Sequence, residues 1–394
     1  MDPLWPLEYL MVFLSMFVTI FVILVYLLNE GKMKEEKPAL RLPKVTVLVP
    51  AYNEEEYIGG ALDSILALDY PKDKLEVIVL NDGSTDRTVQ VVRKSARYGV
   101  KLVNKKNTGK ADSLNRGVAM ANGELIATMD ADSYVTPSTM KKMVAYFEDP
   151  KVASVASSVY VQGAKGLLGT IQQIEYMFAI FSRRIIEFVD CITVTPGPFS
   201  MFRRSSVLEV GGFDPQSLVE DQEIALNLQK HGYLIRTAPG AKVFSEIPKT
   251  FSELKVQRIR WQTGGFYNAL KYKSMIGLKH GDLGLITLPY LIFGYATVAL
   301  IPIFLIMGVL TGSVYSWAVG WEGVRLGFGA IHFLSLFMGL FLFCWIYFGM
   351  KRHFPEEKFG AGSVLIFLSL YPLLTFAFWL FVAYRVALKQ KRSW

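Results

Sequence analysis

Long apolar runs near both ends of the chain frame a central region in which apolar and polar segments alternate. The first run extends from about Leu7 to Leu28, and later runs lie at about 283–311, 326–349 and 361–384. Each has about the 20 residues that an α-helix needs to cross a bilayer. The pattern predicts an integral membrane protein with an N-terminal transmembrane helix at 1–30 and a C-terminal transmembrane region at 283–394, of about three helices.

The N-terminal run is interpreted as a retained anchor rather than a signal peptide, because its start is acidic and no small-residue cleavage site follows. The charged linker at 31–44 and the basic residues of the central region favour the cytoplasm. Three later crossings would then place the basic C-terminus outside, against the positive-inside preference. Pro302 and Pro372 interrupt two of the later runs, so the number of crossings stays open. Apart from His332, these runs lack the ionisable side chains of a transporter or pump.

Between the membrane segments, β-branched runs alternate with stretches of helical spacing. Strands are predicted at 45–49, 75–80 and 124–129, with a helix at 59–68. Continuous apolar runs of this length are typical of parallel strands buried on both faces. The alternation predicts a Rossmann-like α/β domain with a mostly parallel sheet at 45–250, followed by amphipathic interfacial helices at 251–282.

Composition adds a basic balance and few cysteines. The chain has 394 residues, 52% of them hydrophobic, and a formal net charge of +8. We attribute this charge to membrane lipids and anionic phosphate ligands. Nucleic acid is not predicted as a partner, because no long basic run with interleaved aromatic residues precedes the membrane segments. Cys191 and Cys344 lie far apart and predict neither a disulfide framework nor a cysteine metal site.

Acidic residues follow two of the predicted strands, where ligands of parallel sheets bind. Asp82 lies in "NDGSTD", a composition that also suits a plain turn or N-cap. Asp130 and Asp132 are one residue apart, and two such carboxylates suit a hard divalent ion such as Mg²⁺ or Mn²⁺. The lysines of the loop 104–110 are candidates for pairing with phosphates, although a solvated basic loop is the ordinary interpretation.

An acidic cluster, "VEDQE" at 219–223, follows the proline-stiffened segment "TPGPFSMFRR". Adjacent carboxylates repel one another, and a solvated loop tolerates them, so the run alone does not identify a site. The alternative is that one carboxylate is a catalytic base.

The stretch "QRIRW", 257–261, directly precedes the later membrane runs. Gln257 and Arg260 would share a helical face. Arg260 can form a forked hydrogen-bond pair with a diphosphate, and Trp261 offers a flat face to a sugar ring. The alternative is an interfacial helix whose arginines lie at lipid headgroups.

Taken in order, Asp82, Asp130-Ala-Asp132, Glu220-Asp221 and "QRIRW" resemble the motifs of the family 2 glycosyltransferases. They are most similar to the membrane-embedded processive branch, which includes hyaluronan, chitin, cellulose and poly-N-acetylglucosamine synthases. The resemblance covers about residues 44–270. It implies a GT-A fold, a nucleotide-diphosphate sugar donor that is most often UDP-linked, and a divalent metal cofactor.

The resemblance also implies a role for each matching residue. Asp221 corresponds to the catalytic base, with Glu220 beside it, and Asp130 and Asp132 correspond to the metal ligands. The residues that correspond to the donor-binding site are Asp82, Lys110, Asp130, Gln257 and Arg260. Those that correspond to the acceptor-binding site are Trp261, Pro198 and Phe199. Phe199 stands where several members have cysteine, and Val219 stands where threonine is commoner. The first departure leaves the identity of the acceptor open.

The sequence therefore predicts an inverting membrane glycosyltransferase that extends a polysaccharide from a UDP-sugar, with its catalytic domain on the cytoplasmic face of the plasma membrane. Asp221 would deprotonate an acceptor hydroxyl, and Glu220 would raise the pKa of Asp221. The product would pass through the membrane helices, which a homodimer or a partner protein would complete. One alternative is the transfer of a single sugar to a polyprenyl phosphate or other lipid. Enzymes of that kind generally lack the Q-x-x-R-W motif, so the stretch "QRIRW" favours the polysaccharide synthase. A distant alternative is a catalytically silent nucleotide-sugar-binding scaffold, which the presence of Asp221 disfavours.

Overall fold

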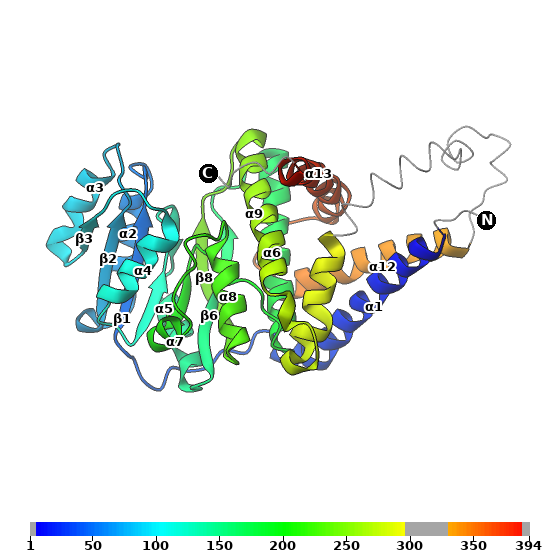
Figure 1. The fold of residues 1–394 in the computed structure, drawn as a ribbon, viewed down its shortest axis with the longest axis horizontal. Helices are drawn as coiled ribbons and strands as arrows, with labels where there is room; N and C mark the ends of the chain where they lie inside the picture. The colour runs from blue at the N-terminus through cyan, green and yellow to red at the C-terminus, as the bar shows by residue number, and fades with distance from the viewer. Residues whose placement is uncertain (1–4, 296–329, 388–394) are drawn as a thin grey trace. The chain divides into compact units, whose positions relative to one another are not determined.

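The computed structural model of the protein describes residues 5–295 and 330–387 (Figure 1). The chain divides into two compact units. The central unit is Asn29–Leu254, and the terminal unit combines Met1–Leu28 with Lys255–Trp394.

The central unit is built on an eight-stranded sheet with the order β3-β2-β1-β4-β7-β6-β8-β5 (Figure 1). Its strands are β1 (Val45–Ala51), β2 (Leu75–Asn81), β3 (Lys101–Asn104), β4 (Leu125–Thr128), β5 (Ser133–Val135), β6 (Val152–Val161), β7 (Ser200–Arg203) and β8 (Leu234–Ser245). β1 pairs in parallel with β2 and β4, β2 pairs in parallel with β3, and β6 pairs in parallel with β8. β7 is antiparallel to β4 and β6, and β5 is antiparallel to β8.

Helices cover both faces of this sheet. They are α2 (Ile58–Leu66), α3 (Thr88–Ser95), α4 (Lys110–Met120), α5 (Thr139–Val144), α6 (Gly166–Glu187), α7 (Arg204–Glu209) and α8 (Glu220–Lys230), with 3-10 turns η1 (Glu30–Lys32), η2 (Lys72–Lys74), η3 (Ala96–Tyr98) and η4 (Ala145–Glu148). Val45, Val47 and Val49 of β1 belong to a buried cluster with α2 and α5. Leu48, which points the opposite way, belongs to a second cluster with α4 and α8. β1 is therefore buried on both faces, as its continuous apolar run predicts.

The three strands predicted from the sequence correspond to β1, β2 and β4, and the helix predicted at 59–68 corresponds to α2. The α/β architecture is confirmed. The sheet is mixed, because two strands run opposite to the other six: β7, which is inserted between β4 and β6, and β5, which is added at the edge. The predicted parallel arrangement holds across β3, β2, β1 and β4, and again between β6 and β8.

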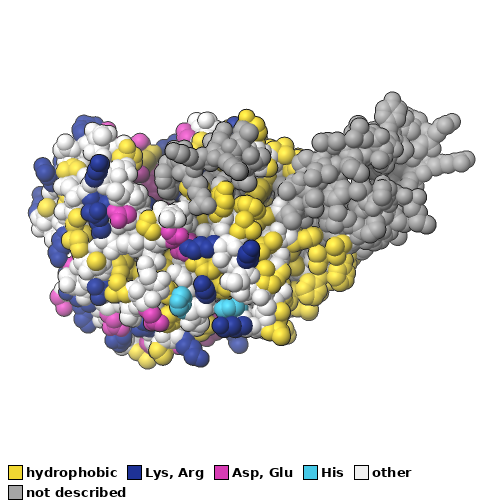
Figure 2. All heavy atoms as spheres, viewed as in Figure 1, with side chains coloured by type: hydrophobic (Ala, Val, Ile, Leu, Met, Phe, Trp, Pro, Cys, Tyr) yellow, Lys and Arg dark blue, Asp and Glu magenta, His cyan; other side chains and the backbone are white. Residues whose placement is uncertain are grey.

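The terminal unit is helical in its described residues. Its elements are α1 (Trp5–Asn29), α9 (Phe251–Lys271), η5 (Lys273–Met275), η6 (Leu278–His280), the π-helical turn η7 (Leu283–Thr287), α12 (Ala330–His353) and α13 (Ala361–Ala387). Two helices in the described part of the chain, at Phe13–Lys32 and Ala361–Tyr384, are long and apolar enough to cross a membrane. Their exposed side chains include Phe13 and Leu373, and hydrophobic side chains gather over these helices in Figure 2. The run predicted at 283–311 continues beyond the shorter apolar helix Leu283–Tyr295 into residues 296–329, which lie outside the described residues.

Candidate active site

Several segments meet at one edge of the sheet in the central unit. Because β1, β2 and β4 are parallel, their carboxyl ends share this edge, and Asp82 and Asp130 follow two of them. β7 runs the other way, and its first residue, Ser200, pairs with Thr128 at the end of β4. The TPGPF segment (195–199) therefore reaches the edge at which Asp82 and Asp130 lie.

Lys110, the first residue of α4, joins two of the predicted site residues. Its Nζ lies 2.6 Å from Asp130 Oδ1 and 2.7 Å from Glu220 Oε1. A Cβ at Gly197 would lie 2.8 Å from Asp130 Oδ2 and 3.0 Å from Lys110 Nζ, so a larger residue there would displace this ion pair. Burial opposes the charge of Lys110, but the neighbouring Asp130, Glu220 and Asp221 outweigh it and raise the pKa of Lys110. The ammonium group is therefore held among three carboxylates.

Asp130 and Asp132 offer hard oxygen donors for a divalent cation. Burial, followed by repulsion from Asp130, raises the pKa of Asp132 to about 6, which indicates that the two carboxylates lie close together. Within the described residues, no three His, Cys, Asp or Glu side chains group closely enough to hold a metal by themselves. The pair fits a Mg²⁺ or Mn²⁺ ion that takes its remaining ligands from water or from phosphate oxygens.

Glu54 is a further carboxylate at this edge that the sequence analysis missed. Burial, with smaller contributions from Asp132 and Asp130, raises the pKa of Glu54 to about 7. Its backbone N–H donates to Thr88 Oγ1 at 2.8 Å, which fixes the turn after β1. Its position directly after a buried parallel strand is the signal that could have identified it.

Asp221, the second residue of α8, is tied to the TPGPF segment through its backbone. Its carbonyl oxygen accepts hydrogen bonds from Thr195 N at 3.2 Å and from Thr195 Oγ1 at 2.8 Å, and its Oδ1 accepts one from Gln222 N at 2.8 Å. Arg183 of α6 lies near this carboxylate: burial lowers the pKa of Arg183 to about 10, an effect that the charge of Asp221 partly opposes. The sequence analysis did not identify Arg183, because no local pattern relates it to Asp221.

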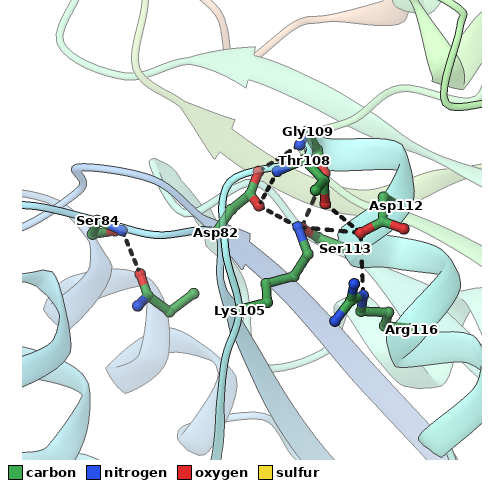
Figure 3. A network of polar contacts seen from close by, with 9 residues as sticks. Asp82, Ser84, Lys105, Thr108, Gly109, Asp112, Ser113 and Arg116 are labelled. Atoms are coloured by element: carbon green, nitrogen blue, oxygen red, sulfur yellow. Dashed lines mark hydrogen bonds and ion pairs between the residues drawn. The ribbon is translucent and has the colours of Figure 1, made fainter.

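Asp82 lies in a network of polar contacts at the start of α4 (Figure 3). Its carboxylate accepts hydrogen bonds from Thr108 N and Gly109 N, both at 2.9 Å, and from Lys105. The Lys105 side chain is only 1% exposed. A phosphate group therefore cannot reach Lys105 in this conformation, whereas Lys106 of the same loop is exposed.

Two predicted acceptor residues lie in the TPGPF segment. Phe199 is fully buried in the cluster that contains Val45 and Val49, and Pro198 is half-buried. Ser157 Oγ donates to the carbonyl oxygen of Phe199 at 2.6 Å. The Phe199 side chain therefore serves the core, and a ligand would contact this segment through its backbone or through Pro198.

The "QRIRW" stretch lies on α9, within the terminal unit. The Arg258 guanidinium carbon lies 4.2 Å from the centre of the Trp261 ring, and Arg258 Nη1 donates to Gln257 Oε1. Because the positions of the two units relative to one another are not determined, the convergence of Gln257, Arg260 and Trp261 with Asp221 stays a prediction.

Comparisons with known proteins identify the family of the chain. Residues 46–211 match the model of Glycosyl transferase family 2. Poly-beta-1,6-N-acetyl-D-glucosamine synthase of Staphylococcus aureus (strain COL) is 31% identical over 282 residues, which cover 66% of this chain and 67% of the relative. The synthase of the same name from Staphylococcus epidermidis is 29% identical over 371 residues, which cover 89% of this chain and 85% of that one.

A similarity in fold comes from a mannosyltransferase of Pyrobaculum calidifontis, solved in complex with GDP-Man and Mn²⁺. Its TM-score is 0.64 at 21% identity, and the match covers 96% of this chain and 99% of that one. This likeness concerns the fold, which is of the GT-A type. The sequence matches show that the chain belongs to the family 2 glycosyltransferases, and its relatives place it with the polysaccharide synthases of that family.

Proposed function

We propose that the protein is a processive synthase that transfers N-acetylglucosamine from its UDP-linked form to a growing β-linked polysaccharide. The observation that carries this proposal is the junction in which Lys110 joins Asp130 to Glu220, beside Gly197 and next to the predicted base Asp221. The polymer is suggested by the relatives named poly-beta-1,6-N-acetyl-D-glucosamine synthase, one of which aligns with 89% of this chain.

In the proposed reaction, Asp221 is the general base. A hydroxyl of the acceptor gives its proton to the Asp221 carboxylate, and its oxygen forms a bond to the anomeric carbon of the donor. The bond between that carbon and the diphosphate oxygen breaks, and the electron pair leaves with UDP. Attack from the face opposite the nucleotide inverts the configuration. The hydroxyl must lie at hydrogen-bond distance from the base, about 2.6–3.2 Å.

On the donor side, we assign the nucleobase to Asp82 and the diphosphate to Lys110, whose ammonium group lies beside Asp130. Asp130 and Asp132 would hold a divalent ion, which supplies positive charge to the departing diphosphate. The position of Lys110 among three carboxylates supports this assignment, since it keeps a cation next to the place where negative charge develops.

In this proposal, the acceptor-binding end of the site lies next to the membrane part of the chain. Gln257, Arg260 and Trp261 on α9 would close over the diphosphate and support the terminal sugar. The apolar helices at Phe13–Lys32 and Ala361–Tyr384 support an integral location, which we assign to the plasma membrane with residues 45–250 in the cytoplasm. Residues 251–282 would lie at the lipid interface between this domain and the membrane region.

Incubation of the purified full-length protein with a panel of UDP-sugars tests the proposal. We expect a ladder of long glycans with UDP-N-acetylglucosamine and Mg²⁺ or Mn²⁺, and release of the product sugars by a β-N-acetylglucosaminidase. A chelator and the Asp221→Asn variant serve as controls, and both should abolish the ladder. A single sugar attached to an added polyprenyl phosphate would instead identify the non-processive alternative. UDP-sugar binding without any release of UDP would identify the silent scaffold.

A further inference from the structure

Lys105, in the loop between β3 and α4, is a buried lysine whose ammonium group is paired with two carboxylates. Its Nζ contacts Asp82 Oδ1 and lies 3.3 Å from Asp112 Oδ2, and its side chain is 1% exposed (Figure 3). Its backbone N–H donates to the Asn81 carbonyl at 3.0 Å, which fixes the loop beside β2. A buried charge requires such partners, so Lys105 and Asp82 stabilise one another in place.

The contacts of Asp82 can be counted oxygen by oxygen. A carboxylate has about four acceptor positions, two on each oxygen. Oδ1 accepts from Lys105 and from Thr108 N, and Oδ2 accepts from Gly109 N. One acceptor position therefore remains, on Oδ2, and 7% of the side chain is exposed.

The surrounding backbone holds this carboxylate in a fixed orientation. Asp82 N donates to the carbonyl of Ala51 at 2.9 Å, and Gly109 adopts a φ of 96° that favours glycine. Thr108 Oγ1 donates to Asp112, the residue that also contacts Lys105. Rotation of the Asp82 side chain would break three hydrogen bonds at once.

The nucleobases differ in what they offer to such a carboxylate. Uracil presents one ring N–H donor between two carbonyl oxygens. Guanine presents a ring N–H and an adjacent amino group, two donors spaced for both oxygens of one carboxylate. With Oδ1 already occupied, the second donor of guanine would lose its partner, and an unpaired buried donor is costly.

We propose that Lys105 is a positioning residue that sets the nucleobase specificity of the donor site: it occupies Asp82 Oδ1, leaves a single acceptor on Oδ2, and so favours uracil over guanine. The inference rests on the proposed function, in which Asp82 binds the base of the donor. It assigns Lys105 a role different from that of Lys110, because Lys105 never touches the phosphates.

The test compares binding of UDP and GDP to the full-length protein with Mn²⁺, by titration calorimetry. We expect the wild type to bind UDP at least about tenfold more tightly than GDP, the factor that one charged hydrogen bond supplies. In Lys105→Met, an acceptor position opens on Oδ1, so UDP binding weakens and the preference for UDP over GDP falls about tenfold. Lys106→Met removes the same charge from an exposed site of the same loop and should leave the preference unchanged. Lys105→Arg, which retains a positively charged hydrogen-bond donor, should keep the preference for UDP over GDP.

A merely structural Lys105 would weaken both nucleotides equally and leave their ratio unchanged, which would overturn the inference. Because Lys105→Met removes one positive charge from a buried cluster, the charge-balanced variant Lys105→Met/Asp112→Asn provides a second measurement with the same expected loss of preference. Equal binding of UDP and GDP by the wild type would also overturn it. A wild type that binds no UDP, but binds another nucleotide, would instead refute the proposed function.

Discussion

Two cations, Lys110 and Arg183, lie near the predicted base, and this changes the electrostatics expected from the acidic run alone. Glu220 Oε1 is engaged by Lys110 at 2.7 Å, so its negative charge is compensated. Arg183 adds a second positive charge near Asp221. Both cations favour an ionised carboxylate, the form that a general base requires. The expected effect of Glu220 on the pKa of Asp221 stays a prediction.

Replacing the base should separate catalysis from donor binding. In Asp221→Asn, the side chain keeps its size but cannot take a proton, so kcat should fall about 10²–10⁴-fold. The backbone contacts of residue 221 with Thr195 are retained, so the affinity for UDP should change little. Both are measured on the same preparation, by UDP release and by calorimetry. A folded variant with more than a tenth of wild-type turnover would exclude Asp221 as the base.

Glu54 should make stability depend on pH. Because burial raises the pKa of Glu54 from 4.5 to about 7, the folded state binds this proton more tightly than the unfolded state. In the presence of a chelator, stability should therefore fall as the pH rises from about 4.5 to 7. Glu54→Gln should remove this loss and have a higher Tm than the wild type at pH 8, with little difference at pH 4.5.

The neighbouring Glu56 provides the matched control, because it is exposed in the same turn, and Glu56→Gln should follow the wild type at every pH.

Addition of Mn²⁺ should raise the Tm of the wild type more at pH 8 than at pH 5. The reason is that Asp132, whose pKa is raised to about 6, must be deprotonated to bind the ion. An Mn²⁺ effect that does not depend on pH would argue against binding by these carboxylates.

On α9, the residues of the "QRIRW" stretch are arranged by a side chain that the motif pattern leaves unspecified. Arg258 is 3% exposed, covers one face of Trp261 and donates to Gln257. Arg258 therefore packs against the ring to which the sequence analysis assigns the acceptor sugar. A guanidinium over an aromatic ring both restrains the ring and adds cation–π attraction.

Removing this support should affect the polymer more than the fold. In Arg258→Met, Trp261 loses its stacked partner, so we expect shorter products at a similar rate of UDP release. Lys255→Met is the control on the same helix, because Lys255 lies 3.9 Å from the ring centre of Phe381 in an equivalent contact. Product length is read from a sizing gel at equal turnover. Identical lengths for the two variants would show that Arg258 has no special role.

The elements that the sequence predicted are those specified by local pattern. β1, β2 and β4 are continuous apolar runs, and the acidic residues that follow them were identified for that reason. β7 and β5 are four and three residues long, and their antiparallel pairing depends on partners far along the chain. Arg183 lies near Asp221 although it is 38 positions earlier in the chain, and a single sequence does not reveal that proximity. Glu54, by contrast, follows β1 and could have been identified by the reasoning that found Asp82 and Asp130.

At the scale of the molecule, the stretch predicted as a linker is bound along the central unit. Tyr70 OH donates to the carbonyl oxygen of Pro43 at 2.5 Å, and Lys142 Nζ lies 3.0 Å from the Glu36 carboxylate. Arg184 donates to the carbonyl oxygens of Lys32 and Met33, at 2.7 and 3.1 Å. Residues 32–43 are therefore fixed to the domain by side chains from α5, α6 and the loop after α2.

Arg184 is the contact on which this attachment should depend most. Its side chain is 6% exposed, and it also pairs with Glu187, which is equally buried, at 2.7 Å. Arg184→Met would leave the Glu187 carboxylate without its cation and two linker carbonyls without a donor, so the variant should be destabilised by about 3 kcal/mol or more. Trypsin should also cleave the linker after Lys34 faster than in the wild type. Lys34→Arg, an exposed substitution in the same stretch that keeps the cleavage site, should have the wild-type Tm and cleavage rate. If Arg184→Met behaves in both assays like Lys34→Arg, the linker is held by its other contacts, and Arg184 does not anchor it.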